Sequence, residues 1–258
     1  MKKYGEAVFG TVTEEYPCVH TSHGSVKGRN KRGAAVFRGI PYGEACIGDK
    51  RFRKAAPASN WKGVRDCTHL GHKSWQAEGN SDLTAKLKLD LILEAYEKEP
   101  EQMGEDCLNL NVVTPGLDNE KRPVAVYFHG GGFSAGSGSL AALSDKWARE
   151  EDIVVVGVNH RLNVFGYLYL GMLDEDYADS GNAGIYDLIL SLEWIRDNII
   201  AFGGDPDNVT IMGESGGCMK VNTLMSMPEA RGLFRRAICE SGSMPVNENT
   251  PEMAAECT

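Results

Sequence analysis

The chain has 258 residues, of which 42% are hydrophobic and 24% charged, a composition that excludes disordered, collagen-like and low-complexity proteins. Its 27 Lys and Arg residues against 36 Asp and Glu residues give a net charge of −9. Because no stretch concentrates basic residues, we expect neither a nucleic acid nor a membrane surface as a partner.

Targeting and redox signals in the sequence are sparse. Lys2 and Lys3 resemble the start of a signal peptide, but no apolar segment follows them, and the longest apolar runs, such as Ile153–Val158, have the length of a strand. The seven cysteines form no CxxC pair, and no histidines cluster, so the sequence predicts no metal site and indicates no cofactor. Sparse cysteines without a signal peptide favour the cytoplasm.

The first hundred residues show two patterns. Short β-like runs separated by glycine turns predict antiparallel strands at Ala7–Val12, Cys18–Thr21 and Ala34–Ile40, with a turn at His23–Ser25. Residues 82–98 carry leucines at i, i+4 spacing between Lys and Glu, and Pro100 follows. This spacing predicts an amphipathic surface helix.

From residue 108 onward, apolar strands alternate with helices. The predicted strands are Leu108–Val113, Val124–Phe128, Ile153–Val158, Val209–Met212 and Ala237–Cys239. The predicted helices are Ser144–Glu151, Gly184–Ile200 and one that begins at Ser215. Continuous apolarity is typical of parallel strands covered on both faces. The pattern therefore predicts an α/β domain that binds its ligand outside the carboxyl ends of the strands.

The motif Gly-x-Ser-x-Gly occurs twice, around Ser215 and around Ser134. A nucleophile elbow needs a strand, a tight turn and an immediate helix, and only Ser215 has the strand Val209–Met212 before it and a helix-forming segment after it. Ser134 is followed by Gly136-Ser137-Gly138, a poor helix start. The sequence therefore predicts Ser215 as the nucleophile and favours no catalytic role for Ser134.

The segment His129–Phe133, here called the oxyanion loop, directly follows the predicted strand Val124–Phe128. Consecutive glycines after a core strand leave backbone N–H groups free to face a cleft, which suits an oxyanion hole. We assign this hole to the N–H groups of Gly131, Gly132 and Gly216. A turn or a phosphate loop is the alternative, but neither a P-loop Lys-Ser/Thr nor a GxGxxG helix start follows.

Further motifs extend over nearly the whole chain. They are FRGIPY at 37–42, RF at 51–52, WKGV at 61–64, EDCLNLNV at 105–112, HGGGF at 129–133, NHRL at 159–162, FGGDP at 202–206, GESGG at 213–217 and ESGS at 240–243. With them, the chain resembles the N-terminal half of a type-B carboxylesterase, an α/β-hydrolase family that includes the cholinesterases. The resemblance implies a mostly parallel central sheet with helices on both faces, small antiparallel N-terminal strands, and a single, incomplete domain over residues 1–258.

The resemblance also implies roles for single residues. Ser215 becomes acylated, and Glu214 is the acidic residue beside the nucleophile, with an electrostatic role or, alternatively, that of a solvated carboxylate at a helix start. Arg51 and Glu105 resemble a structural ion pair. Family members commonly carry a disulfide that ends at Cys107, but Ser74 stands where its partner would be and Cys67 is shifted, so we expect no bridge.

A serine nucleophile needs a base, normally a histidine held by a carboxylate, and in α/β-hydrolases both follow the serine. None of the six histidines follows Ser215. His129 belongs to the oxyanion loop, and His160 is expected to pack at a strand end. Because family members are roughly twice this length, the resemblance places the acid and the histidine in an absent half.

Three interpretations stay open. The favoured one is a piece of a serine esterase that hydrolyses a small-molecule ester through an acyl-enzyme. The second is one half of a split esterase, in which a C-terminal half docks on the sheet edge left open after Ala237–Cys239. The third is a noncatalytic, cholinesterase-like binding protein.

Overall fold

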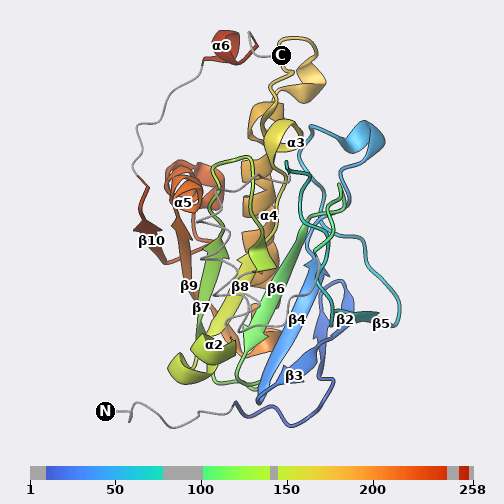
Figure 1. The fold of residues 1–258 in the computed structure, drawn as a ribbon, viewed down its shortest axis with the longest axis vertical. Helices are drawn as coiled ribbons and strands as arrows, with labels where there is room; N and C mark the ends of the chain where they lie inside the picture. The colour runs from blue at the N-terminus through green and yellow to red at the C-terminus, as the bar shows by residue number, and fades with distance from the viewer. Residues whose placement is uncertain (1–9, 78–100, 140–144, 243–249, 256–258) are drawn as a thin grey trace.

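A computed structural model describes residues 10–77, 101–139, 145–242 and 250–255. Its centre is a seven-stranded sheet with the strand order β10-β9-β7-β8-β6-β4-β3, and a three-stranded sheet, β1-β2-β5, lies beside it (Figure 1). The large sheet consists of β3 (Arg29–Lys31), β4 (Ala34–Pro41), β6 (Asn109–Thr114), β7 (Arg122–Phe128), β8 (Val154–Val158), β9 (Gly204–Glu214) and β10 (Arg236–Glu240). The small one consists of β1 (Cys18–Thr21), β2 (Gly24–Lys27) and β5 (Val64–Asp66).

The large sheet is mixed. Strands β8, β7, β9 and β10 are parallel to one another, whereas β3, β4, β6 and β8 pair antiparallel. The predicted antiparallel start and the predicted parallel strands are thereby confirmed, with one difference at β6. All of its residues are buried, yet it runs antiparallel to both neighbours, because elements that cover both faces of a sheet bury a strand in either direction.

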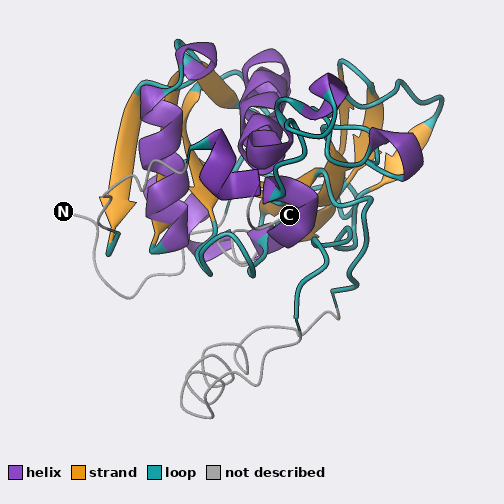
Figure 2. Ribbon diagram, turned by 90° about the horizontal axis from the view of Figure 1, so that it is seen from above, coloured by secondary structure: helices purple, strands orange, loops and turns teal. Residues whose placement is uncertain are grey.

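Helices lie on both faces of the large sheet, as Figure 2 shows. Ala148 of α2 (Asp145–Glu151) packs with Val36, Val113 and Val155 on one face. Helices α4 (Ala183–Asn198) and α5 (Gly216–Ser226) contribute to the larger core on the other face. Shorter helices are α3 (Asn163–Tyr167) and α6 (Pro251–Ala255), and single 3-10 turns are η1 (Gly48–Lys50), η3 (Glu175–Tyr177), η4 (Ser180–Asn182), η5 (Ile199–Phe202) and η6 (Pro228–Ala230).

The structure corrects some predicted elements. The predicted strand Ala7–Val12 is wrong in its described part, because residues 10–12 form no strand; Val12 donates to the Gly33 carbonyl at 3.0 Å and its carbonyl accepts from Asn30 Nδ2 at 2.7 Å. Strand β9 begins at Gly204 rather than Val209, since Arg122 pairs with Gly204 before an irregularity in the register. The predicted helix over 82–98 lies outside the described residues.

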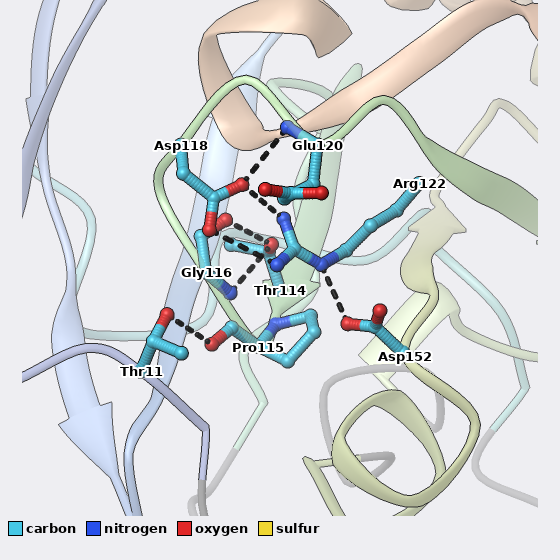
Figure 3. Close-up of polar contacts among 8 residues, drawn as sticks. All are labelled: Thr11, Thr114, Pro115, Gly116, Asp118, Glu120, Arg122 and Asp152. Atoms are coloured by element: carbon cyan, nitrogen blue, oxygen red, sulfur yellow. Dashed lines mark hydrogen bonds and ion pairs between the residues drawn. The ribbon is translucent and has the colours of Figure 1, made fainter.

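An arginine fixes the amino end of β7, at the edge opposite the predicted site. Arg122 Nε donates to Asp152 Oδ1 at 2.7 Å, and its Nη2 donates to Asp118 Oδ2 at 3.0 Å (Figure 3). Its backbone N–H bonds the Gly203 carbonyl at 2.9 Å. The ion pair raises the pKa of Arg122 and lowers that of Asp118, so both groups stay charged. We infer that this network holds β7 in register and leaves its carboxyl end to carry the site.

Candidate active site

The carboxyl ends of the parallel strands meet at one edge of the sheet. Phe128, the last residue of β7, pairs with Gly213 of β9 and with Val158 of β8. Glu240 at the end of β10 pairs with Glu214. The segments that follow these strands, including the oxyanion loop and Ser215, therefore start from the same level of the sheet.

Ser215 forms a strained turn between β9 and α5. Its φ is 53° and its ψ −119°, a conformation that is costly for a residue with a side chain. Its N–H donates to the Glu240 carbonyl at 2.9 Å, and its own carbonyl accepts from the Met219 N–H at 3.2 Å. The turn is thus tied to the neighbouring strand and to the helix that follows, which leaves the serine exposed at the sheet edge.

Close backbone contacts explain the glycines on either side of Ser215. A Cβ atom on Gly213 would lie 2.4 Å from the Gly217 carbonyl carbon, and one on Gly217 would lie 2.1 Å from the Phe128 carbonyl oxygen. Neither glycine has a positive φ. They are required because strand, helix and the end of β7 approach one another closely.

The oxyanion loop is held by its carbonyl groups. The Gly131 carbonyl accepts from the N–H groups of Ser134 at 3.3 Å and Ala135 at 3.1 Å, and Nδ1 of His129 donates to the Gly130 carbonyl at 2.9 Å. Gly131 and Gly132 have φ values of 85° and 64°. Within the described residues, the N–H groups of these two glycines donate no hydrogen bond, so they stay free for a ligand.

The loop and the serine turn are in direct backbone contact. A Cβ atom on Gly216 would lie 2.4 Å from the Gly132 nitrogen, and one on Gly130 would lie 3.6 Å from the Ser215 Cβ atom. Gly216 is also the first residue of α5, where helical N–H groups lack a partner within the helix. The structure therefore brings Gly131, Gly132 and Gly216 together beside Ser215. With alanine at 216, this packing would be impossible without a shift of the loop.

Glu214, the last residue of β9, and Ser134 are both exposed and lie next to the oxyanion loop. Glu214 is exposed, and its Oε2 atom lies 3.1 Å from the place that a Cβ atom on Gly130 would take. Ser134 lies in the turn after Gly132, with its Oγ donating to the Gly131 carbonyl at 3.3 Å. Ser134 has no positive φ and starts no helix, so it differs from Ser215 in local structure.

No base partners Ser215 within the described residues, since no histidine ring hydrogen-bonds its Oγ atom. His129 is buried and bonds inside its own loop, and burial lowers its pKa to about 3. His160 is buried as well, and its ring stacks on that of His129 with centroids 4.8 Å apart. Burial also holds the pKa of His160 well below its usual value. Both rings are neutral at pH 7 and lie in the packing around the loop.

Sequence reasoning missed Lys220, which is fully buried on α5. Its Nζ atom donates to the His129 carbonyl at 2.9 Å. The signal was present in the spacing: Gly216, Lys220 and Leu224 lie at i, i+4 positions and share the buried face of the helix. A lysine on such a face belongs to the interior rather than to solvent.

The framework around the site contains the ion pair that the resemblance implies. Arg51 and Glu105 form a two-bond ion pair, with Nη2 2.7 Å from Oε1. The six described cysteines are free thiols, and the hydroxyl of Ser74 bonds the Cys107 thiol in place of a disulfide. Across the described ranges, no group of three or more His, Cys, Asp or Glu side chains could hold a metal ion. None of the described helices has both the length and the apolarity to cross a membrane.

The chain is similar to known proteins over most of its length. The sequence model of the Carboxylesterase family matches residues 15–255. The chain belongs to this carboxylesterase family. It is 41% identical over 226 residues to the para-nitrobenzyl esterase of Bacillus subtilis, which covers 87% of the chain and 43% of that protein. It is also 41% identical over 239 residues to the phenmedipham hydrolase of Pseudarthrobacter oxydans, covering 92% and 45%.

Solved structures agree with this membership in the carboxylesterase family. A carboxylesterase of Geobacillus stearothermophilus superposes with a TM-score of 0.81 at 41% identity, over 93% of this chain and 46% of that one. The juvenile hormone esterase of Manduca sexta superposes with a TM-score of 0.76 over 89% and 41%. The α/β-hydrolase fold predicted from the sequence is confirmed. The chain spans less than half the length of these carboxylesterases.

Proposed function

We propose that the natural protein hydrolyses carboxylic esters through an acyl-enzyme formed on Ser215. The observation that carries this proposal is the contact between the strained Ser215 turn and a glycine loop whose N–H groups are free. Strain at a functional residue persists only where the surroundings enforce it, here through the bonds to Glu240 and Met219. Esterase and hydrolase activities named for the relatives support the same reaction class.

Each group has a defined part in the proposed reaction. The Ser215 hydroxyl gives its proton to the base and its oxygen attacks the ester carbonyl, while the N–H groups of Gly131, Gly132 and Gly216 stabilise the resulting oxyanion. The ester C–O bond then breaks, the alcohol leaves with the proton from the base, and water hydrolyses the acyl-enzyme to release the acid and restore the Ser215 hydroxyl. Glu214, beside the loop, adds negative charge near the base that becomes cationic during attack. The substrate is a small-molecule ester, and none of these steps calls for a metal or a cofactor.

The base and its orienting acid are proposed to lie in a part of the carboxylesterase fold that this chain does not include. The relatives are more than twice as long as the matched region, and within the described residues no imidazole bonds the Ser215 hydroxyl. Residues 1–258 alone are therefore expected to hydrolyse esters slowly. Oxyanion stabilisation and binding without a base still give about 10³–10⁴-fold over water.

A split esterase is the second candidate. Among the residues that the structure describes, strand β10 lies at the end of the sheet order and pairs only with β9. Ile238 on this strand is 44% exposed. An unpaired strand edge with an apolar side chain favours docking of another segment. That segment would supply the acid and the histidine, and a cytoplasmic location, predicted from the sparse cysteines, suits free thiols on both pieces.

The test is hydrolysis of p-nitrophenyl butyrate by the natural gene product. We expect Ser215→Ala to reduce kcat by about 10⁴-fold or more, the scale seen when a serine nucleophile is removed. Ser134→Ala is the matched control, because it removes the hydroxyl of the other Gly-x-Ser-x-Gly motif, and it should retain most of the rate.

Three results are distinguishable. Unchanged turnover in Ser215→Ala contradicts the proposed nucleophile. Activity of residues 1–258 that appears only after a second polypeptide is added supports the split esterase. A natural protein that neither hydrolyses esters nor reacts with a fluorophosphonate, but binds a protein partner, is instead a noncatalytic member of the family.

A further inference from the structure

Lys220 is a buried cation that the proposed reaction has not used. It is 0% exposed, and the Nζ hydrogen bond to the His129 carbonyl, 2.9 Å long, is directed at the first residue of the oxyanion loop. Within the described part of the chain, no carboxylate forms an ion pair with it. The ring of Phe133, the last residue of the loop, has its centroid 5.7 Å from Nζ. Lys220 thus contacts both ends of the oxyanion loop.

The groups around Lys220 are neutral imidazoles. His129 and His160 stack on each other, and both ring nitrogens of His160 are buried without a hydrogen-bond partner. Arg161 follows His160, but its charge is paired with Asp187, Nη2 to Oδ1, at 2.6 Å. The backbone carbonyl of His129 therefore accepts from Lys220, and the stacked imidazoles at the ends of β7 and β8 supply no negative charge.

Such an arrangement is costly for the fold. An ammonium group that leaves water needs an ion pair or several hydrogen bonds, and an apolar side chain of similar volume would be as stable or more stable at the same place. Burial accordingly lowers the pKa of Lys220 to about 7. A single carbonyl bond does not compensate for this burial, so stability does not explain the lysine.

We propose that Lys220 is a positioning residue for the oxyanion loop in the ester hydrolysis proposed above, on which this inference rests. Its hydrogen bond fixes the His129 carbonyl and hence the plane of the peptide that leads into Gly130. Its positive charge lies against both ends of the oxyanion loop and attracts the negative charge that develops on the substrate oxygen.

Two physical effects act together in this role. The hydrogen bond from the ammonium group holds the His129–Gly130 peptide in one orientation, and this peptide leads into Gly131 and Gly132, whose N–H groups form the proposed hole. Charge interactions in a water-poor site are also much stronger than in bulk solvent. Both effects stabilise the transition state more than the bound ester, because only the former carries a full negative charge on the oxygen. Lys220 keeps its proton throughout, so no proton transfer is assigned to it.

The role predicts a dependence on pH. As pH rises through about 7, the ammonium loses its proton and the attraction is lost. His129 and His160 stay neutral over this range because burial lowers both pKa values. Burial is also the cause of the lowered pKa of Lys220. In the described ranges, no carboxylate on β9, β10 or α4 raises this pKa again. We expect kcat to fall on the alkaline side of pH 7 for this reason.

The first experiment compares Lys220→Met with Lys220→Arg in the natural gene product, with p-nitrophenyl butyrate as substrate. Loss of one oxyanion donor costs about 10²–10³-fold, so loss of a residue that aligns the donors should reduce kcat about 10–100-fold. KM should change less than about twofold, because the ground state gains little from the charge. The arginine variant should recover much of kcat and lack the decline above pH 7, since arginine stays charged.

Lys146→Met is the matched control, because Lys146 lies on the solvent side of α2. It should leave kcat and its pH profile unchanged. A Lys220→Met variant that retains the wild-type kcat and the alkaline decline overturns the positioning role. If Ser215→Ala also retains the rate, the proposed function fails instead, and the two failures are therefore distinct.

A second readout needs no enzymatic turnover. In residues 1–258, Lys220→Met should speed amide hydrogen exchange in the segment 129–136 at least about tenfold, while the melting temperature stays equal or rises because a buried charge is removed. Equal exchange in this segment overturns the positioning role. A lower melting temperature with exchange raised throughout the chain identifies a purely structural lysine and overturns it as well.

Discussion

Two segments of this chain share the pattern Gly-x-Ser-x-Gly but need its glycines for different structural reasons. Around Ser215, the serine itself takes the positive φ of 53°, and the flanking glycines are needed because backbone approaches within 2.1–2.4 Å of where a Cβ atom would be. Around Ser134, the glycines take the positive φ values, 64° at Gly132 and 120° at Gly136, and the serine does not. The positive φ falls on the serine in one motif, where it costs energy, and on glycines in the other, where it costs little.

This difference explains why the pattern Gly-x-Ser-x-Gly alone does not identify a nucleophile, whereas the strand before it and the helix after it do. A strand before the motif and a helix directly after it force the chain to reverse within one residue, which then projects its side chain from the sheet edge. A loop can spread the same reversal over several glycines. The position of the strain, rather than the spacing of the glycines, therefore distinguishes the predicted nucleophile from an ordinary loop serine.

Acid should reveal the packing that supports the Ser134 segment, and this is the largest effect on stability that we expect. Burial lowers the pKa of His129 to about 3 and that of His160 well below 6.5. At pH values below 6.5 and above the pKa values in the folded protein, the unfolded chain binds more protons than the folded one. The free energy of unfolding therefore decreases as pH falls below 6.5. Urea unfolding of residues 1–258 should lose on the order of 2 kcal/mol per imidazole between pH 6.5 and 5.

His160→Phe provides the control for this acid effect. Phenylalanine keeps the stacking on His129 and removes two ring nitrogens that lack partners. It should leave stability at pH 7 equal or higher and remove about half of the loss between pH 6.5 and 5. An unchanged loss in this variant would show that other groups cause the acid sensitivity.

Gly217 of the Ser215 motif and Gly132 of the Ser134 motif should respond differently to substitution. Gly217→Ala places a methyl group against the Phe128 carbonyl and should lower the free energy of unfolding by about 1–3 kcal/mol. At Gly132 the nearest atom is the Ser134 Oγ at 4.0 Å, so Gly132→Ala meets only the strain of its φ, about 1 kcal/mol.

Asparagine separates crowding from strain at these positions. It tolerates a left-handed φ, so Gly132→Asn should be more stable than Gly132→Ala, whereas Gly217→Asn should be no better than Gly217→Ala. Urea denaturation of the four variants measures both differences. The same order at both positions would contradict the distinction between the motifs.

The smallest expected effect concerns the serines themselves and differs in sign between the motifs. Ser215→Gly relieves the strained φ and should raise the free energy of unfolding by about 1 kcal/mol while hydrolysis is lost. Ser134→Gly only adds conformational freedom to the unfolded chain and should lower the free energy of unfolding by about 0.5 kcal/mol. A Ser215→Gly variant less stable than wild type would show that the turn is not strained.

Much of the fold could be predicted from the sequence because the patterns that indicate its strands and helices are local. Strands β7, β8 and β10 and helices α4 and α5 follow apolar runs and helical stripes, and their bounds differ from the predicted ones by a few residues. Strand β3 was missed because its three polar residues, which pair with the adjacent strand β4, read as part of a turn, and the early start of β9 was missed because it pairs only with a residue distant in sequence, Arg122 with Gly204. Such pairing depends on the tertiary fold rather than on propensity.

The sequence motifs predicted the residues of the candidate site but not the lysine that supports the oxyanion loop. Ser215 and the glycines of the loop stood out because turns and free N–H groups demand these residue types. Lys220 did not, since a lysine in a helix usually faces solvent, and only the carbonyl of His129, 91 residues away in the chain, gives it a partner. Sequence spacing indicated its buried face but not the group that it meets.

Covalent labelling tests the central claim most directly. The natural gene product is treated with a fluorophosphonate, digested, and the phosphonylated residue is located by mass spectrometry. The account predicts a single adduct on Ser215, with Ser134 unmodified, and no adduct in the Ser215→Ala variant. An adduct on Ser134, or an unmodified Ser215 in a preparation that hydrolyses p-nitrophenyl butyrate, would contradict it.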